Sequence, residues 1–397
     1  MVSVKEASEI ILGHLTAPKS ITVDLSAATG KVLAAPVRAD RDLPPFDRVA
    51  MDGIAIRYEE WTKGRRVFQV AGTQAAGEPV KTLADPSQCM EVMTGASLPE
   101  GCDTVVKYED SEIDNGCATV SLYEVALMDN VHRRGLDAVR GQVLLERGTK
   151  ISPSEVAVLA SVGRETVEVY AFPSVAIIST GDELVDVGVV PQPHQIRLSN
   201  SWALKSALNV MGADGDHFHL RDEQRSMEAR LAQIADQYEV LILSGGVSKG
   251  KFDFVPDTLE KIGIRKLFHR VSQRPGKPFW FGASEKGNIA FALPGNPVST
   301  FMCFYKYIKP WMQKCMGLSS SERFATLGRG VRFSAPMTYF LQVSLENVAG
   351  TLFANPEPGG GSGDFVNLAK ATGFLELPAE KSEFGKGEVY PYIAFRD

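Results

Sequence analysis

The sequence predicts a multidomain protein in which a central α/β domain is flanked by regions of β-structure. From Pro173 to about Gly317, short apolar runs alternate with helical patterns, which is typical of a parallel sheet covered by helices. Between Val67 and Asn130, and again after Gly317, short β-like runs are separated by turn residues, which predicts two smaller β regions. A chain of 397 residues can hold about two to four such domains.

Composition and charge exclude several classes of protein. Hydrophobic residues make up 44% of the chain and charged residues 23%, as in ordinary globular proteins. No apolar run approaches the roughly 20 residues that span a bilayer, and Glu6 and Glu9 interrupt the apolar core that a signal peptide needs. The net charge of −6 gives no general attraction to nucleic acid or to anionic membranes. Five cysteines without a CxxC pair argue against disulfides and structural zinc, and favour the reducing cytoplasm.

Two helices in the first half of the chain follow from local patterns. Ser152 can cap a helix, Pro153 suits its first position and Glu155 completes a capping box, which together predict a helix from 153 to about 161. The other helix is predicted at the N-terminus, where apolar residues recur at helical spacing: Val4, Ala7, Ile11 and Leu15.

The most informative stretch follows the apolar run 240–243, which reads as a buried strand. Residues 244–246, Ser-Gly-Gly, come next, then a charged segment that includes Ser248 and Asp253, and Pro256 stands where a helix can begin. A strand, a glycine turn and a helix N-terminus are how an α/β sheet presents backbone N–H groups to an anion. A plain turn that merely needs glycine explains this stretch about equally well.

Three further loops follow strands of the same predicted sheet. Residues 179–183 bring two carboxylates, Asp182 and Glu183, of the hard oxygen type that Mg²⁺ prefers. Residues 270–278 place cations around a Pro-Gly turn, and residues 293–297 form a rigid Pro-Gly-Asn-Pro corner. Each alone could be an ordinary surface turn, but strand ends of a parallel sheet share one edge. Acids and bases interleaved there predict phosphate chemistry.

The motifs, in their order, resemble those of the molybdopterin molybdenumtransferase (MoeA) family, which is related to the gephyrin E domain. They include LPPFDRVAMDGIAIR, MTGASLPEGCDTVVKYED, NVHRRGLD, ISPSEVAVLASVG, STGDEL, SNSWALKSAL, LSGGVSKGKFDF, RPGKPFWFG and LPGNPVS, and they span most of the chain. The resemblance implies four regions: a helical linker domain at 1–45 and 136–172, an inserted β-domain at 46–135, a molybdopterin-binding α/β domain at 173–317 and a C-terminal β-barrel at 318–397.

The resemblance also implies a function. Members insert molybdate into adenylylated molybdopterin, with Mg²⁺-assisted release of AMP, to form the molybdenum cofactor. We therefore expect molybdopterin-AMP and molybdate as substrates and Mg²⁺ as the metal. We also expect a homodimer whose active site is shared between subunits and a molybdopterin adenylyltransferase as a further partner, with no role for nucleic acid or membrane.

Site residues are carried over from the resemblance by their position in the motifs. The catalytic set contains two residues supplied by the facing subunit, Asp52 and Thr94, together with Glu183, Asp222, Asp253 and Lys277. The metal ligands are expected among Asp253, Asp222 and Glu183. The residues expected to bind the pterin nucleotide or the oxyanion are Thr180, Gly181, Ser244, Gly245, Gly246, Ser248, Arg274, Pro294, Gly295, Asn296, Pro297, Arg133 and Asp137.

Three positions depart from the family pattern. Arg274 replaces a lysine, which keeps the charge but brings a planar fork, and Leu136 replaces a common glutamate. Lys251 stands where an acid is usual, so it would either weaken a metal site or lower the pKa of the neighbouring Asp253. Two alternative functions stay open: a catalytically weak scaffold of the gephyrin E type, and a paralogue that inserts tungstate.

Overall fold

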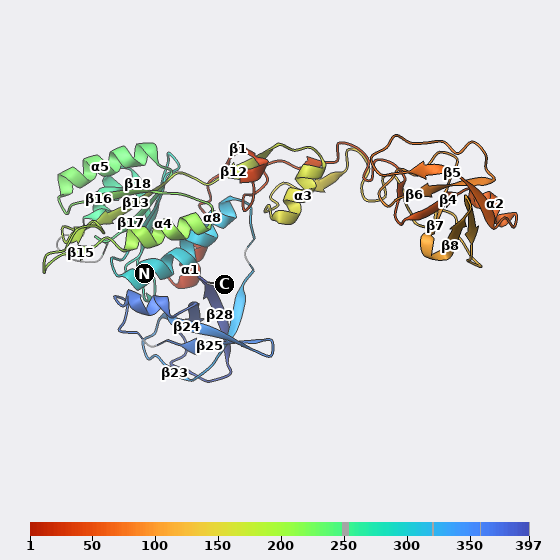
Figure 1. The fold of residues 1–397 in the computed structure, drawn as a ribbon. Helices are drawn as coiled ribbons and strands as arrows, with labels where there is room; N and C mark the ends of the chain where they lie inside the picture. Colours follow the sequence, from red (N-terminus) through yellow and green to blue (C-terminus); the bar gives the residue numbers. More distant parts are fainter. Residues whose placement is uncertain (248–253, 320, 358, 397) are drawn as a thin grey trace. The chain divides into compact units, whose positions relative to one another are not determined.

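The structure is a computed structural model. It describes residues 1–247, 254–319, 321–357 and 359–396, and the predicted site residues Ser248 and Asp253, like Lys251, lie outside the described residues. Contacts divide the chain into two compact units (Figure 1). The α/β unit comprises residues 1–23, 30–34 and 168–397, and the insert unit comprises residues 24–29 and 35–167. This division is coarser than the four predicted regions, whose boundaries stay a prediction.

The α/β unit is built on a six-stranded sheet with the order β16-β13-β17-β21-β20-β18. The four strands from β16 to β21 run parallel, and β20 and β18 are antiparallel at one edge. This confirms the predicted parallel-rich sheet. The strands are β13 (Val175–Thr180), β16 (Asp216–Leu220), β17 (Val240–Ser244), β18 (Ile264–His269), β20 (Trp280–Ser284) and β21 (Ile289–Leu293).

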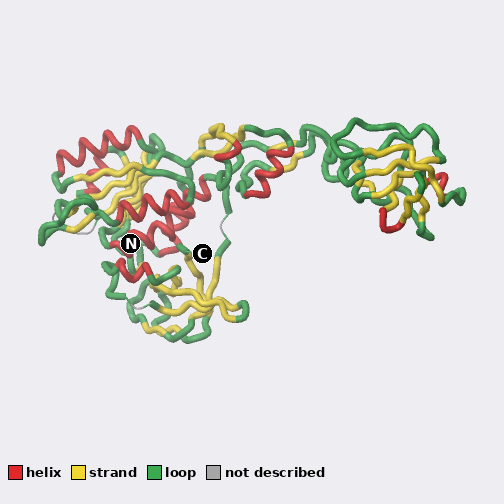
Figure 2. Tube along the Cα trace, in the orientation of Figure 1, coloured by secondary structure: helices red, strands yellow, loops and turns green. Residues whose placement is uncertain are grey.

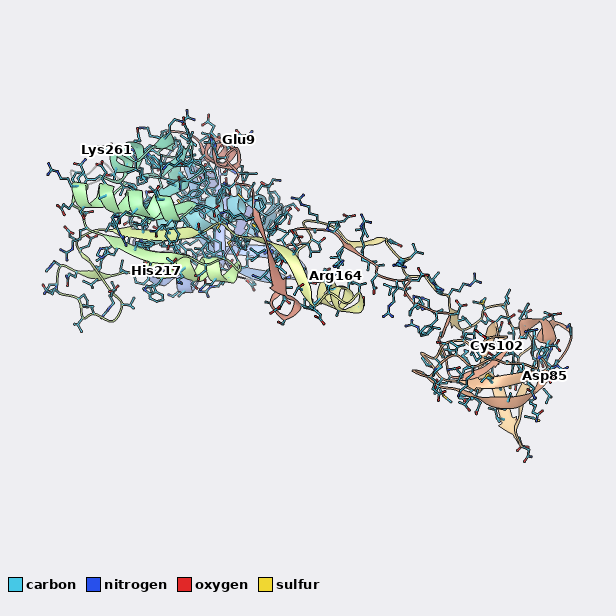
Figure 3. The ribbon with its side chains drawn as sticks, turned by 90° about the horizontal axis from the view of Figure 1, so that it is seen from above. Glu9, Asp85, Cys102, Arg164, His217 and Lys261 are labelled. Atoms are coloured by element: carbon cyan, nitrogen blue, oxygen red, sulfur yellow. The ribbon has the colours of Figure 1, made fainter. Side chains whose placement is uncertain are left out.

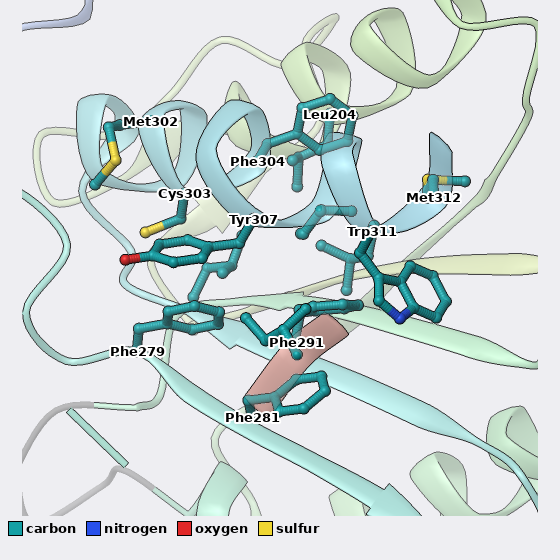
Figure 4. Close-up of a cluster of buried hydrophobic side chains, with 14 of the residues drawn as sticks. Leu204, Phe279, Phe281, Phe291, Met302, Cys303, Phe304, Tyr307, Trp311 and Met312 are labelled. Carbon is teal, nitrogen blue, oxygen red and sulfur yellow. The ribbon is translucent and has the colours of Figure 1, made fainter. Parts of the chain in front are cut away.

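Helices cover both faces of this sheet because its strands are apolar on both sides. Along β13, Ile177 packs into the cluster that contains Leu204 and Trp311, whereas Ile178 packs with Met227 on the other face. Figure 1 shows α5 on one side of the sheet and α4, α8 and α1 on the other. Figure 4 shows aromatic side chains that pack between the sheet and the helices of this other side. The covering elements are α1 (Val4–Leu12), α4 (Asn200–Val210), α5 (Gln224–Gln237), α6 (Val255–Lys261), α7 (Pro297–Cys303), the π-helical turn η3 (Phe304–Ile308) and α8 (Lys309–Cys315).

The N-terminal helix α1 confirms the predicted amphipathic pattern with one exception. Its capping box joins Ser3 and Glu6, and three of the four predicted apolar residues are buried. Leu15 is 43% exposed, so its inclusion in the helical face is wrong. The reason is that the helix ends before it, at Leu12, where Gly13 forms the C-cap.

The C-terminal part of the α/β unit is a barrel of five strands. Strands pair in the order β24-β25-β22-β28-β26, and β26 pairs back with β24, which closes the barrel as predicted. The short strand β19 (Gln273–Arg274) adds to β24 in parallel and connects the barrel to the α/β sheet domain. The barrel strands are β22 (Arg323–Leu327), β24 (Thr338–Val348), β25 (Thr351–Pro356), β26 (Gly373–Leu377) and β28 (Val389–Ala394), with β23 (Val331–Arg332), β27 (Glu383–Phe384) and η4 (Phe365–Ala369) beside them.

The insert unit contains its own six-stranded sheet, with the order β7-β4-β6-β5-β9-β8, which confirms the predicted β region (Figure 2). Ile54, Trp61 and Phe68 belong to its core. Cys102 and Asp85 lie in this unit, whereas His217 and Lys261 lie in the α/β unit (Figure 3). The strands are β4 (Gly53–Ile56), β5 (Val67–Gln74), β6 (Gln88–Val92), β7 (Thr104–Lys107), β8 (Ser111–Asp114) and β9 (Cys117–Val120), with α2 (Tyr58–Thr62) and η2 (Tyr108–Asp110).

The remaining elements are short. Helix α3 (Pro153–Ser161) confirms the predicted helix, and its capping box between Ser152 and Glu155 is present. Nowhere in the described ranges is a helix both long and apolar enough to cross a membrane. The other elements are β1 (Lys19–Asp24) with β12 (Thr166–Ala171), β2 (Val37–Arg38) with β11 (Val143–Leu145), β3 (Arg48–Val49) with β10 (Val131–His132), β14 (Leu184–Val185) with β15 (Ile196–Arg197), and η1 (Leu25–Ala27).

Candidate active site

The carboxyl ends of β13, β17 and β21 meet at one edge of the sheet. Their register places Ser179 opposite Ser244, and Ser244 opposite Leu293, so the three loops that follow begin at one level. A hollow of about 550 Å³ opens there, and we call it the strand-edge hollow. It brings together eleven predicted residues: Thr180, Gly181, Glu183, Asp222, Ser244, Gly245, Gly246, Pro294, Gly295, Asn296 and Pro297.

The loop after β13 holds Glu183 close to the backbone. Gly181 has a φ of +140°, and a Cβ on it would lie 2.6 Å from the Glu183 carboxylate. The positive φ favours glycine here, and a Cβ would push the exposed Glu183 carboxylate aside. From the neighbouring strand β16, His219 contacts the Gly181 carbonyl oxygen through Nε2 at 2.8 Å. The turn that carries Glu183 is therefore fixed from both sides.

The glycine pair after β17 lets this loop approach the end of β13. Gly245 has a φ of +102°, and a Cβ on it would lie 2.7 Å from the Thr180 carbonyl oxygen. Gly246, with a φ of +64°, lies against the same threonine. The hydroxyl of Thr180 is buried and has no hydrogen-bond partner in the described part of the chain. A buried hydroxyl beside a hollow, without a partner of its own, is suited to meet a ligand.

Asn200, which sequence reasoning had not singled out, ties two of these loops together. Its Nδ2 group donates to the Ser244 hydroxyl and to the Gly295 carbonyl, each at 2.8 Å, and lies 3.5 Å from the Thr300 hydroxyl. It stands at the start of α4, where asparagine is a common helix-end residue, so its position alone carried no signal. Arg197 is a second lining residue that the sequence had not indicated.

A second hollow, of about 920 Å³, adjoins the first and shares Pro278, Pro294 and Asn296 with it. We call it the basic hollow because the predicted cations Arg274 and Lys277, both exposed, line one of its walls. The barrel supplies further lining residues, among them Arg329, Ser362 and Glu357, the last of which brings a carboxylate. Arg329 donates to the Pro356 carbonyl oxygen at 2.5 Å.

The glycine-rich loop 359–363 makes specific contacts with the Pro-Gly-Asn-Pro corner. Ser362 accepts a hydrogen bond from Asn296 Nδ2 at 2.9 Å through its hydroxyl and one from the Val298 N–H at 3.1 Å through its carbonyl. Within the loop, the Asp364 carboxylate accepts from the Gly360 N–H at 2.8 Å. These bonds attach the barrel to the rim of both hollows.

In the insert unit, the two residues predicted to act from a facing subunit form a pair. The Asp52 carboxylate accepts hydrogen bonds from the Thr94 N–H at 2.6 Å and from its hydroxyl at 2.8 Å. These two bonds, the backbone one first, hold the pKa of Asp52 below its usual range. Gly53 makes the arrangement possible, because a Cβ there would lie 2.0 Å from the Val106 carbonyl oxygen of β7.

Tyr108 and Glu91 extend this pair, although the sequence had not indicated them. The Tyr108 hydroxyl donates to the Glu91 carboxylate at 3.2 Å. Burial, and then the nearby Glu91 charge, raise the pKa of Tyr108 to about 12, so the phenol stays a donor at neutral pH.

Arg133 and Asp137, predicted by the arginine-glycine motif, lie in another part of the insert unit. Arg133 is exposed, and Asp137 accepts from His132 Nε2 at 2.9 Å. The adjacent Arg134 has a structural contact instead, since its Nε donates to the Asp42 carboxylate at 2.7 Å.

Comparisons with known proteins extend over the whole chain. Residues 2–163 match the model of the MoeA N-terminal region (domain I and II), residues 176–314 that of a probable molybdopterin binding domain, and residues 325–395 that of the MoeA C-terminal region (domain IV). A molybdopterin molybdenumtransferase from Synechocystis is 39% identical over 399 residues, covering 100% of both chains. One from Staphylococcus epidermidis is 29% identical and covers 99% of this chain and 95% of the relative.

Solved structures agree with these matches. Two solved structures of molybdopterin biosynthesis MoeA proteins from Pyrococcus horikoshii have TM-scores of 0.86 and 0.85 and sequence identities of 29% and 26%, and each match covers 100% of both chains. Since the sequence, the parallel-rich sheet and the closed barrel all match from end to end, the chain belongs to the MoeA family.

Proposed function

We propose that this chain is a molybdopterin molybdenumtransferase, which inserts molybdate into adenylylated molybdopterin and releases AMP. The name of its full-length relatives supports the activity. The observation that carries the proposal is the pair of adjoining hollows at the carboxyl edge of the sheet, one built from glycine turns and one lined by cations. A reaction between a nucleotide-linked pterin and an oxyanion needs both kinds of site next to each other.

The strand-edge hollow suits the pterin nucleotide. Glycine turns at the ends of parallel strands bring backbone groups close to phosphates. Asn200 keeps Ser244 and Gly295 at a fixed separation, and the Thr180 hydroxyl, which has no partner among the described residues, can meet the ligand. These residues would bind and orient the substrate.

The basic hollow suits molybdate, a doubly charged oxyanion. The fork of Arg274 and the point charge of Lys277 can share its oxygens, and Arg329 adds a third cation from the barrel. The Glu357 carboxylate, which also lines this hollow, accepts a hydrogen bond from the Ser344 hydroxyl at 2.7 Å. Removing water around the oxyanion would strengthen its attraction to the cations.

Mg²⁺ is compatible with the residues present. Glu183 and Asp222 both line the strand-edge hollow, and Mg²⁺ is usually held by one or two carboxylates, by waters and by substrate phosphates. In the described residues no group of three His, Cys, Asp or Glu side chains could hold a metal, and the third predicted ligand, Asp253, lies outside them. When bound, the ion would offset charge on the phosphate that leaves.

We further propose a cytoplasmic homodimer in which Asp52 and Thr94 of one subunit complete the site of the other, served by a molybdopterin adenylyltransferase. The support is chemical: the Asp52 carboxylate is held ionised by Thr94 and is exposed to solvent, so a substrate could reach it. All five cysteines are free thiols, which suits a reducing compartment. Sedimentation would give the oligomeric state, and mixing Asp52→Asn with Lys277→Ala protein would restore activity only if sites are shared.

The test of the proposed function is molybdate-dependent AMP release from adenylylated molybdopterin, followed by chromatography. Lys277→Ala and Arg274→Ala are expected to raise the apparent KM for molybdate about tenfold or more, with little change for the pterin nucleotide. The matched control is Lys286→Ala, which removes an exposed lysine that pairs with Asp236 on another part of the sheet domain. Absence of AMP release, with or without molybdate, would reject the enzyme and favour the scaffold alternative.

Two further measurements refine the proposal. Competition between tungstate and molybdate during cofactor formation decides which oxyanion is used. An Asp253→Asn variant that released AMP at the native rate would remove that carboxylate from the mechanism, and a Lys251→Asp variant would report how the reversed charge beside it acts.

A further inference from the structure

Behind the Arg-Pro-Gly-Lys-Pro turn lies a buried amide, Gln273. Its side chain is fully buried, and its Nε2 group donates to the Gly276 carbonyl at 3.0 Å and to Cys303 Sγ at 3.5 Å. Its Oε1 atom accepts a hydrogen bond from the Tyr307 hydroxyl. Both ends of the amide are therefore satisfied inside an otherwise apolar cluster.

The amide lies directly against the turn. Gly276 has a φ of +89°, and a Cβ on it would lie 2.7 Å from Gln273 Nε2 and 2.8 Å from Cys303 Sγ. The same turn is closed by a backbone hydrogen bond from the Val271 N–H to the Lys277 carbonyl at 3.0 Å. Because Gly276 stands one residue before Lys277, the amide fixes the backbone from which that cation projects.

Tyr307 reaches the amide from an unusual helix geometry. It belongs to the π-helical turn η3, between α7 and α8, and such turns are frequent at functional sites. Figure 4 shows its hydroxyl near Cys303 and its ring above Phe279. Burial raises the pKa of Tyr307 well above its ordinary value, so the phenol remains a donor across the working pH range.

The same turn also contacts the barrel. Lys306, the residue before Tyr307, pairs with Glu376 of β26 at 2.6 Å, and both side chains are mostly buried. Near Gln273 itself, β19 pairs with β24 of the barrel, with Arg274 opposite Tyr339. Consecutive residues of η3 thus contact the turn, through Tyr307 and Gln273, and the barrel, through Lys306 and Glu376.

We propose that Gln273 and Tyr307 are positioning residues for the basic hollow, which hold the turn so that Arg274 and Lys277 can bind an oxyanion together. The inference rests on the proposed function of that hollow as the molybdate site. An apolar pair of similar volume would fill the same space without a desolvation cost, so a buried polar pair is better explained by the single turn conformation that it specifies. Neither side chain touches the substrate in this view, and both act through the backbone.

The experiment uses full-length protein with Tyr307→Phe, Gln273→Met and the double variant, each of which keeps the local volume. Calorimetric titration with molybdate gives its Kd, and steady-state assays give the apparent KM for molybdate and for the pterin nucleotide. We expect the Kd for molybdate to rise about tenfold in each single variant, because one cation leaves its binding geometry. The KM for the pterin nucleotide should stay within about twofold of the native value. The Kd of the double variant for molybdate should be no higher than that of the single variant that binds molybdate more weakly.

The matched control is Tyr305→Phe, which removes a hydroxyl from the same π-helical turn without touching Gln273. If both test variants bind molybdate with the native Kd and lose only thermal stability, the positioning role is wrong. The outcome for Arg274→Ala and Lys277→Ala separates the two claims. If those variants also bind molybdate normally, the hollow is not the molybdate site, and the proposed function of the hollow fails as well.

Discussion

The contact that joins the loops of the strand-edge hollow can be tested by changing Asn200 to aspartate. The new side chain has the same shape, but when ionised it has no donor for Ser244 or for the Gly295 carbonyl. The Ser244 hydroxyl can turn and donate to the new carboxylate, whereas the bond to the Gly295 carbonyl is lost, at a cost of about 1–3 kcal/mol in the free energy of unfolding. A carboxylate oxygen facing the Gly295 carbonyl oxygen adds repulsion, so we expect a total loss of about 2–4 kcal/mol.

The assay is urea unfolding of the variant and the native protein, together with the KM for the pterin nucleotide. Because Ser244 and Gly295 belong to different loops, their separation should raise this KM about tenfold or more. Asn209→Asp is the control, since it makes the same change on an exposed side chain of the same helix and should shift stability by less than about 0.5 kcal/mol.

The pH dependence of unfolding provides an internal check on why Asn200→Asp destabilises the protein. The introduced carboxyl should have a raised pKa in the folded state, so its destabilising effect is full above that pKa and is relieved as the pH falls and a donor returns. The loss relative to native protein should therefore shrink at low pH. A variant with native stability and native KM at neutral pH would show that the bridge does not hold the loops, and the reasoning about this hollow would be refuted.

Three other predictions follow from the geometry. Gly245→Ala should raise the KM for the pterin nucleotide and lower the free energy of unfolding by about 1–3 kcal/mol, because the new Cβ would lie 2.7 Å from the Thr180 carbonyl oxygen. A native KM and a native unfolding curve would contradict this. Thr94→Val removes the hydroxyl bond but keeps the backbone N–H bond, so it should raise the pKa of Asp52 part of the way toward its ordinary value and move the acid limb of the pH–rate profile to higher pH; carboxyl NMR titration measures the shift directly, and an unchanged pKa would exclude the hydroxyl bond as a contributor. Ser152→Ala should cost about 1 kcal/mol by removing the α3 cap, measured by denaturant unfolding, and a cost near zero would show that the helix does not depend on it.

Much of the fold was accessible from the sequence because its determinants are local. The Ser152 capping box and the prolines in the first turns of α6 and α7 depend only on residues a few positions away. Apolar runs bounded by glycine predicted the strands, and the loops after them were expected at one edge because parallel strands end together. The failure at Leu15 has an equally local cause, an early C-cap at Gly13.

Residues that join distant segments could not be predicted in this way. Asn200 reads as a helix-end residue, and Gln273 as an ordinary position before a turn, until the fold brings Gly295 and Tyr307 to them. The partners lie 95 and 34 positions away, and no periodicity encodes such a pairing. Arg329 belongs to the same class, because the barrel must close before it can reach the basic hollow.

The glycine-rich loop 359–363 shows how distant residues can hold a segment whose composition favours flexibility. Glycine makes an isolated loop flexible because its backbone loses much entropy on ordering. Here that cost is offset by the bonds that Ser362 accepts from the Asn296 side chain and the Val298 N–H, and by the Asp364 carboxylate within the loop. Order at this rim is therefore a tertiary property, and it should be lost locally, as faster amide exchange, when Ser362 is changed to glycine.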